Sequence, residues 1–218
     1  MPGTVVYSIV KPLVTVLALA AVTAATAAAA TQTLTLTPSA TVVTYGKTVT
    51  LTGQLAPAKA NQNITIDGTA CGTTRAAKVT TAKTAATGAF SATVTPTVGT
   101  TYQATLKNVK SPAVAIAVRP LLQLTKGAHS TWTAKVTAGQ SLTGKAVLFQ
   151  RYAKLRKRWV QVKRVVLGTA TPGTTKPTVI MTASFKAKLA RGTRVRLAIS
   201  KAQAGPCYVA ATSASLRA

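Results

Sequence analysis

Residues 86–106 carry the sequence ATGAFSATVTPTVGTTYQATL, in which apolar and polar side chains alternate on both sides of a short interruption. Alternation with a period of two predicts strands that bury one face, and Pro96 and Gly99 predict a turn between them. We therefore expect strands at residues 90–95 and 102–106.

The same alternation of Thr with Val, Leu or Ile recurs along the first half of the chain. Further strands are predicted at residues 33–37, 48–52, 63–66, 77–81 and 114–118. Gly, Pro and Asn separate these segments, as turn residues do. Seven short strands within about ninety residues are typical of a β-sandwich.

The pattern starts again after Arg119-Pro120, which indicates a diverged internal repeat. The alignment matches residues 88–94 with 182–189 around a shared Phe, 99–106 with 192–199, and 111–114 with 213–216. The repeat therefore predicts an all-β chain with two tandem β-sandwiches. The predicted boundaries are 1–30 for the signal peptide, 31–119 for the first domain and 120–218 for the second.

The first domain contains TVTLTGQL at residues 48–55 and SPAVAIAVRP at 111–120, in addition to the opening segment. In this it resembles the tandem bacterial Ig-like domains of secreted actinobacterial surface proteins. Their strand pair follows the pattern T…G-x-F/W…P…T-x-Y-x-A, and residues 87–104 match it. The second domain keeps Phe185 but has Val195 in place of the Tyr. The resemblance implies that the predicted fold class is all-β, with two tandem immunoglobulin-like β-sandwiches after an N-terminal signal helix. It also implies export and display at the surface or wall, and it supplies no catalytic residue.

The first thirty residues have the organisation of an export signal. Lys11 gives the positive charge, LVTVLALAAV at residues 13–22 gives the apolar region, and Ala28 to Ala30 give small residues for cleavage. The alternative is an uncleaved signal that stays in the membrane, although its second half is only weakly apolar. We expect a secreted or cell-surface protein that contacts a membrane only if the signal is retained.

Acidic side chains are almost absent from the chain. Asp67 is the one carboxylate residue against 27 Lys and Arg, and there is no Glu. Most hydrolytic mechanisms and most hard-cation sites need carboxylates, and His129, Cys71 and Cys207 are too dispersed in sequence to suggest a zinc site. The composition therefore predicts a non-enzymatic protein without catalytic residues, metal, cofactor or small-molecule substrate.

The positive charge is concentrated in the second domain. Residues 120–218 hold eighteen Lys and Arg and no acid, whereas residues 31–119 hold eight together with Asp67. A long hairpin is expected from residues 146–152 to 159–167, with its tip at 154–157. The predicted polyanion-binding residues are Arg151, Lys154, Arg156, Lys157, Arg158, Lys163, Arg164, Lys186, Lys188, Arg191, Arg194 and Arg196.

Two aromatic residues flank the predicted tip of this hairpin. Tyr152 and Trp159 would stack on bases or sugars if their rings were exposed. The alternative is that Trp159 packs on the sheet, and Trp132 is expected in the core.

The two cysteines fall in different domains. Cys71 follows the predicted strand at 63–66, and Cys207 is expected to open the last strand of the second domain. In an Ig-like sandwich the first of these places lies at the end where the chain leaves the domain, so the two thiols are expected to meet at the junction. The alternative is that they stay unpaired or pair between chains.

The leading hypothesis is a secreted or wall-associated Ig-like interaction protein whose second domain binds an anionic polymer, such as teichoic-type or acidic polysaccharide, electrostatically. The alternatives are extracellular nucleic-acid binding through Tyr152 and Trp159, and a purely structural spacer.

Overall fold

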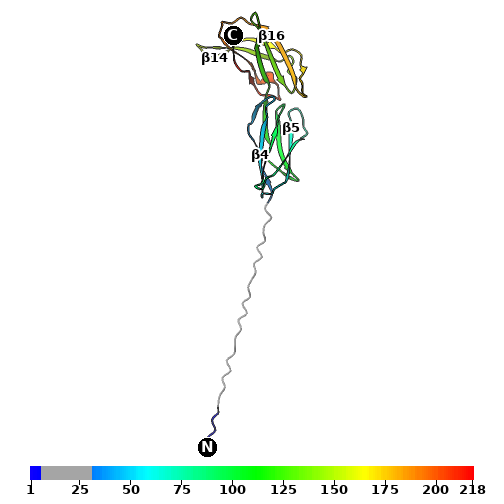
Figure 1. Cartoon of the computed structure of the whole chain (residues 1–218), viewed down its shortest axis with the longest axis vertical. Coiled ribbons are helices and arrows are strands. Elements are labelled where there is room, and N and C mark those ends of the chain that lie inside the picture. The colour runs from blue at the N-terminus through cyan, green and yellow to red at the C-terminus, as the bar shows by residue number, and fades with distance from the viewer. Residues whose placement is uncertain (6–30) are drawn as a thin grey trace. The chain divides into compact units, whose positions relative to one another are not determined.

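A computed structural model describes residues 1–5 and 31–218, so residues 6–30 of the predicted signal peptide lie outside the described part. Residues 31–218 form one unit, built almost entirely of strands (Figure 1). The fold is all-β, as predicted, and consists of two tandem β-sandwiches joined at Pro120.

The first sandwich packs a sheet in the order β1-β4-β2, with β7 also paired to β4, against a sheet in the order β3-β10-β8-β5-β6, with β9 paired to β8. In the first sheet the strands are β1 (Thr33–Leu34), β2 (Thr37–Pro38), β4 (Val49–Ala56) and β7 (Ala89–Val94). In the second they are β3 (Val42–Thr44), β5 (Asn63–Ala70), β6 (Ala77–Lys83), β8 (Thr100–Leu106), β9 (Val109–Lys110) and β10 (Val114–Arg119).

The second sandwich packs a sheet in the order β11-β12-β16-β15 against a sheet in the order β14-β13-β17-β18, with β19 also paired to β17. In the first of these the strands are β11 (Leu121–Lys126), β12 (Thr131–Ala138), β15 (Thr171–Pro172) and β16 (Val179–Lys186). In the other they are β13 (Ala146–Ala153), β14 (Arg158–Val166), β17 (Arg194–Ile199), β18 (Ala211–Thr212) and β19 (Leu216–Arg217). A single turn of helix, α1 (Lys201–Ala204), follows β17.

Both sandwiches have immunoglobulin-like strand order. In the usual lettering, β4 and β7 are strands B and E, while β5, β8 and β10 are C, F and G of the facing sheet. In the second sandwich, β12 and β16 take the places of B and E, and β13, β17 and β19 those of C, F and G, while β18 corresponds to β9. Buried residues alternate with exposed ones in β7 and with half-buried ones in β12, so each strand buries one face.

The strands predicted from alternation in the first sandwich are present with boundaries shifted by a few residues, except that the predicted strand at 33–37 is divided into β1 and β2. The short strands β3 and β9 were not predicted. β3 pairs in parallel with β10, matching Val42 with Ala117 and Thr44 with Arg119. Because this partner is far away in the sequence, the residues around β3 show no pattern that predicts a strand.

The repeat alignment is wrong in one part. Phe90 stands at the start of β7 opposite Gly53, and the ring lies where a side chain on Gly53 would project. Phe185 stands near the end of β16 opposite Trp132. The place of Phe185 in the first sandwich is therefore near Val94, which pairs with Val49 at the start of β4.

The last third of the repeat is in register. The Ser111 hydroxyl accepts a hydrogen bond from the Ala104 backbone N–H at 3.0 Å, and the Ser213 hydroxyl accepts one from Leu197 at 2.9 Å. Each hydroxyl also donates to the carbonyl of the following residue at 2.8 Å. These matching contacts fix the same bend before strand G in both sandwiches.

The core of the second sandwich is centred on three aromatic rings. Phe149 lies 5.2 Å from Trp132 and 5.0 Å from Phe185, measured between ring centroids. Trp132 is 1% exposed, as predicted, and its indole N–H donates to the carbonyl of Ala187 at 3.1 Å.

Candidate functional site

The β13–β14 hairpin forms where the sequence predicted it. Its strands pair from Ala146 opposite Val166 to Ala153 opposite Arg158, and residues 154–157 make the tip. Lys157 closes the turn by donating its backbone N–H to the carbonyl of Lys154 at 3.2 Å. A bulge between Phe149 and Gln150 shifts the register and changes which residues of the hairpin share a face.

An arginine–aromatic cluster forms on the outward face of the sheet that contains this hairpin. On β17, Val195 and Leu197 are buried, so the alternating residues Arg194 and Arg196 face outward. Beside them, Tyr152 and Trp159 stand opposite each other across the hairpin, with their rings 5.4 Å apart at 65°.

The rings of the cluster are covered in part by guanidinium groups. Arg196 lies 4.3 Å from the centroid of the Trp159 ring, while Arg194 lies 5.8 Å from that centroid and 5.5 Å from that of Tyr152. These distances are within the range of cation–π attraction. Trp159 is half-buried, which agrees with the prediction that it packs on the sheet.

Arg196 is the most enclosed cation of the cluster. Its Nε donates to the side-chain carbonyl of Gln150 at 2.9 Å, and burial lowers the pKa of its guanidinium. Gln150 was not among the predicted site residues. It stands opposite Arg196 in the pairing of β13 with β17, a contact between distant segments that the residue pattern does not reveal.

A hollow of about 450 Å³ opens beside the cluster at the end of the hairpin. Its walls carry the cationic side chains of Arg151, Lys154, Arg156 and Arg194, together with Tyr152, Ala153, Leu155, Val160 and Thr193. Leu155 at the tip is fully exposed. The walls thus combine four positive groups, apolar surface and no acid.

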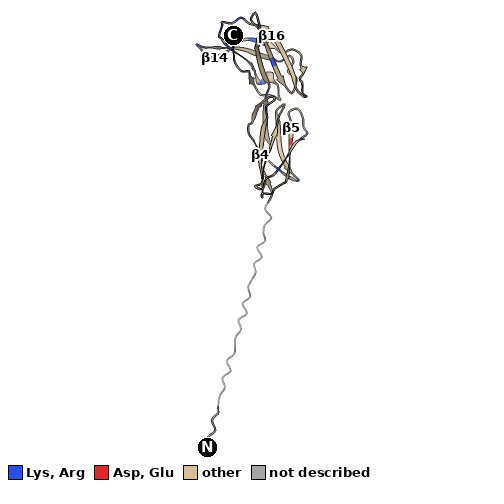
Figure 2. Cartoon of the chain, in the orientation of Figure 1, with Lys and Arg blue, Asp and Glu red and all other residues tan. Residues whose placement is uncertain are grey.

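The predicted polyanion-binding residues do not all share one surface. All are exposed except Arg196, which is half-buried. Arg151, Lys154, Arg156, Lys157, Arg158 and Arg164 belong to the hairpin, and Arg194 and Arg196 lie next to it on β17. Figure 2 shows the Lys and Arg positions on the second sandwich and the single acidic position on β5.

The other predicted cations are directed elsewhere. Lys186 follows the buried Phe185 on β16, so it faces outward from the opposite sheet. Lys163 reaches between the sheet edges and donates its ammonium to the carbonyl of Lys186 at 3.4 Å. Lys188 and Arg191 lie in the connection to β17. The predicted Lys186–Arg196 surface is therefore divided between the two sheets.

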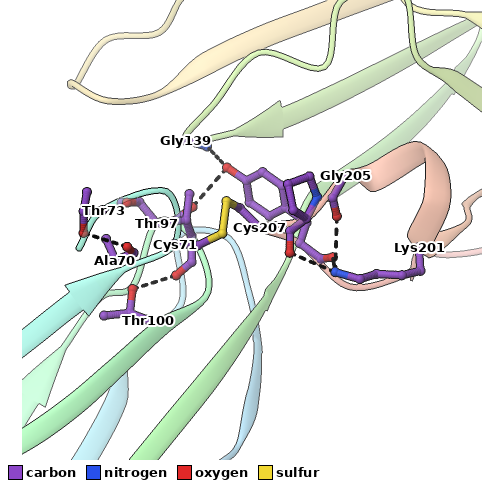
Figure 3. Close-up of a disulfide and its surroundings, with 12 residues drawn as sticks. Ala70, Cys71, Thr73, Thr97, Thr100, Gly139, Lys201, Gly205 and Cys207 are labelled. Atoms are coloured by element: carbon purple, nitrogen blue, oxygen red, sulfur yellow. Dashed lines mark hydrogen bonds between the residues drawn. A yellow bond between two sulfur atoms is a disulfide. The ribbon is translucent and has the colours of Figure 1, made fainter.

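The Cys71–Cys207 disulfide joins the two sandwiches, as predicted (Figure 3). Cys71 directly follows β5 at the end of the first sandwich, and the bond spans a sequence separation of 136. The prediction that Cys207 opens the last strand is wrong, because Cys207 lies in the segment between α1 and β18. A bond of this kind is typical of proteins in oxidising compartments.

Main-chain and tyrosine hydrogen bonds surround the disulfide. The Gly99 N–H donates to the carbonyl of Cys207 at 2.9 Å. The Tyr208 hydroxyl donates to the carbonyl of Thr97 at 3.2 Å and accepts from the Gly139 N–H at 2.8 Å. A side chain on Gly139 would meet the Thr97 carbonyl at 2.8 Å, so this close approach needs glycine. Tyr208 therefore ties both sandwiches together next to the covalent bond.

Lys201 anchors the segment that carries Cys207. Its ammonium donates to the carbonyls of Gly205, Pro206 and Tyr208 at 3.2, 2.9 and 2.6 Å (Figure 3). Neither Lys201 nor Tyr208 was singled out from the sequence. The position of Tyr208 next to Cys207 is the one signal that could have indicated its role.

Comparison with known proteins gives limited similarity. No protein-family model matches the chain, and no curated protein matches it. Among solved structures, a marsupial T cell receptor is similar at 8% identity and a TM-score of 0.34, over 85% of this chain and 100% of that chain. This similarity carries no argument about function. The fold and the site define an immunoglobulin-like β-sandwich protein with a cationic, arginine–aromatic surface.

Two further findings concern the described residues alone. No helix among residues 1–5 and 31–218 is long and apolar enough to cross a membrane. Within the same residues, no three His, Cys, Asp or Glu side chains come together in a way that could hold a metal ion.

Proposed function

We propose that this chain is a non-enzymatic, exported Ig-like interaction protein whose second sandwich binds anionic polymers at a cell wall or in the extracellular space. The predicted signal segment and the resemblance to Ig-like domains of secreted actinobacterial surface proteins support export. The interdomain disulfide is consistent with the oxidising conditions outside the cell.

The observation that carries the proposal is the grouping of cations along the β13–β14 hairpin and β17. The hollow at the end of this hairpin is lined by Arg151, Lys154, Arg156 and Arg194. Residues 120–218 contain no acidic side chain that could neutralise them. Their combined electric field attracts polyanions. Such binding weakens steeply as the salt concentration rises, because the counterions released on binding then gain less entropy.

The arginine contacts of the Tyr152 and Trp159 rings favour polymers without bases over nucleic acid as the ligand. Bases bind single-strand-binding proteins by stacking on open aromatic faces. Here Arg196 lies 4.3 Å from the Trp159 centroid and Arg194 contacts both rings. A base would have to displace a guanidinium before it could stack.

The test compares two sets of four charge-neutralising substitutions. One variant changes Lys154, Arg156, Lys157 and Arg158 at the hairpin to Gln, and the matched control changes the exposed Lys78, Lys83, Lys107 and Lys110 of the first sandwich to Gln. Binding of each protein to isolated cell walls and to a teichoic-type polymer is measured across a salt series.

The slope of log affinity against log salt is expected to fall by about 3 in the hairpin variant, since each lost phosphate contact removes about 0.7 to 0.9. The control is expected to lose less than about 1. Equal losses in both variants would show that the second sandwich has no special role. The absence of binding by the unmodified protein would refute the proposed function.

A further inference from the structure

We infer that the tip of the β13–β14 hairpin docks on a bilayer that contains anionic lipids and inserts the side chain of Leu155 into it. This inference goes beyond the proposed function, because a bilayer is a different partner from a wall or extracellular polymer. It brings residues 31–218 to a membrane even if the signal peptide is removed.

The first argument concerns the position of the tip. β17 pairs with β13 only as far as Arg151, whereas the pairing of β13 with β14 continues to Ala153 opposite Arg158. Residues 154–157 therefore lie at the end of a two-stranded ribbon, which projects from the side of the second sandwich beside the label β14 in Figure 1. A projecting tip reaches a flat surface before the body of the sandwich does.

The second argument concerns Leu155 itself, whose apolar side chain is fully exposed. The other large apolar side chains that are exposed within residues 31–218 are only between 37% and 53% exposed, and they are Val42, Val79, Val162, Val166 and Leu216. A leucine side chain gains free energy when it leaves water for hydrocarbon. A hydrated polyanion offers it no hydrocarbon, whereas a bilayer does.

The third argument concerns the charges around Leu155. Its neighbours Lys154, Arg156, Lys157 and Arg158 are all exposed cations. Long Lys and Arg side chains extend back toward the headgroups while a neighbouring residue enters the apolar layer. Each cation near an anionic bilayer surface raises the binding constant about fivefold. Since residues 120–218 contain no acid, no side chain of this sandwich is repelled by that surface.

The fourth argument separates a bilayer from an acidic protein as the partner. A specific protein interface of standard size uses about 20 to 30 residues on each side. The projecting tip and the residue after it offer only residues 154–158. Binding to a bilayer needs no matching shape, because it depends on the apolar surface inserted and on attraction to anionic lipids. A small tip with one apolar side chain among cations therefore suits a bilayer better.

The experiment measures binding to two kinds of vesicle at about 150 mM salt, where long-range attraction is screened. One kind contains equal parts of phosphatidylglycerol and phosphatidylcholine, and the other contains phosphatidylcholine alone. The protein is residues 31–218, which form one unit and contain the whole described core. It lacks the apolar segment at 13–22, which would itself bind lipid.

The decisive variant is Leu155→Ser, which removes the apolar side chain and keeps every charge. The matched control is Val79→Ser on β6, which removes an exposed apolar side chain from the corresponding hairpin of the first sandwich. Binding to the anionic vesicles is expected to fall about tenfold in Leu155→Ser and to stay within about twofold in the control. Because its charge is unchanged, Leu155→Ser should bind isolated cell walls as the unmodified protein does.

The charges are tested in the same assay. The variant with Gln at Lys154, Arg156, Lys157 and Arg158 is expected to lose more than about a hundredfold in binding to the anionic vesicles, and vesicles of phosphatidylcholine alone should bind the unmodified protein more weakly by a similar factor. An unchanged melting temperature confirms that each variant folds.

Insertion is tested directly with Leu155→Trp. Its fluorescence is expected to shift to shorter wavelength on anionic vesicles and to be quenched by lipids that carry bromine on their acyl chains, since the new indole enters the apolar layer. Val79→Trp is the control and should show neither change.

Four results would overturn the inference. Equal vesicle binding by Leu155→Ser and the unmodified protein would show that the tip does not insert, and equal binding to both kinds of vesicle would show that the cations have no role. Absence of vesicle binding together with binding to cell walls would leave the proposed function standing alone. Equal loss of wall and vesicle binding in Leu155→Ser would assign Leu155 to a contact that is not specific to lipid.

Discussion

The β5–β6 hairpin of the first sandwich and the β13–β14 hairpin of the second occupy the same place in the fold. Their bulges fall at equivalent points, between Ile66 and Asp67 in one and between Phe149 and Gln150 in the other. Asp67 stands opposite Gln103 on β8, and Gln150 stands opposite Arg196 on β17. The two hairpins share this backbone arrangement. The charged residue of the pair is the acid Asp67 on β5 in the first sandwich and the base Arg196 on β17 in the second.

The hairpins differ most in how their first strand ends. In the first sandwich β5 leads to Cys71 and the bond to Cys207, whereas in the second β13 leads to the cationic tip at residues 154–157. The same end of strand C therefore attaches one sandwich to its neighbour and carries the cationic surface in the other. One backbone position thus takes different side chains, and in the second sandwich these are the ones proposed to bind the polymer.

The largest expected effect follows removal of the Cys71–Cys207 disulfide. Changing Cys71 and Cys207 together to Ser removes a cross-link across 136 residues, and the chain-entropy argument predicts a loss of about 4 to 5 kcal/mol in the free energy of unfolding. Denaturant unfolding of the oxidised protein and the double variant measures it. Reducing the unmodified protein should reproduce the loss, and equal midpoints for all samples would contradict a stabilising role.

The next effect concerns Tyr208 at the junction. Burial raises the pKa of its hydroxyl to about 12 from 10.0. The folded state favours the neutral form of the hydroxyl. The contribution of this preference to the free energy of unfolding is therefore complete below pH 10 and is lost as the pH rises toward 12. A shift of this size corresponds to about 2 to 3 kcal/mol.

Unfolding free energies at pH 9 and pH 11.5 test this expectation in the unmodified protein and in Tyr208→Phe. The variant should be less stable at pH 9, because it lacks the bond to Thr97, but it should lose less on going to pH 11.5. Both described cysteines are in the disulfide, so thiol exchange from free cysteine does not disturb the comparison. Parallel losses in both proteins would assign the alkaline sensitivity to other groups.

A smaller effect compares the two serines that fix the bend before strand G. Ser111 is 3% exposed, whereas Ser213 is half-buried. Ser111→Ala leaves the N–H of Ala104 without its acceptor in a buried place and is expected to cost about 1 to 3 kcal/mol. Ser213→Ala should cost about 1 kcal/mol, because water can reach the freed group. Thermal unfolding measures both, and Ser91→Ala on the exposed face of β7 is the control.

The smallest effect concerns charge repulsion. Eighteen Lys and Arg without an acid in residues 120–218 repel one another, and screening weakens when the Debye length rises from about 8 Å to about 30 Å at 0.01 M salt. The four-residue Gln variant of the hairpin should therefore recover about 0.5 kcal/mol at low salt, while the matched variant of the first sandwich should recover less. Melting temperatures at 10 and 150 mM salt provide the measurement, and equal recovery would remove the distinction between the sandwiches.

The sequence predicted the parts of the fold in which burial alternates locally. Strands such as β7 and β8 follow from the period of their own residues, and the β13–β14 hairpin follows from two runs of strand-forming residues around a charged turn. The disulfide was predicted from strand order, which places Cys71 correctly at the junction. Cys207 reaches the junction from the segment between α1 and β18 and not from the last strand. The strand β3 could not, because its three residues are ordered by parallel pairing with β10.

The candidate site was predicted by composition more than by geometry. Charge identified the hairpin, but the contacts of Arg194 and Arg196 with Trp159 depend on the bulge in β14, where Val162 has no partner on β13, and the residue pattern does not show it. The Phe-based alignment failed for a related reason. It matched residue types, whereas the equivalent of Phe185 is defined by its pairing with Trp132.

The Cys71–Cys207 bond also determines how the chain carries mechanical load. Tension applied between Thr31 and Ala218 passes from Cys71 directly to Cys207, so residues 72–206 lie outside the stretched path. The arginine–aromatic cluster and the hollow are within this shielded loop. A protein pulled by its ends would extend only through residues 31–71 and 207–218, so the bond limits the length that tension can draw out. Because residues 207–218 include β18 and β19, which pair with β17, load on the C-terminal end acts on the sheet that carries the cluster.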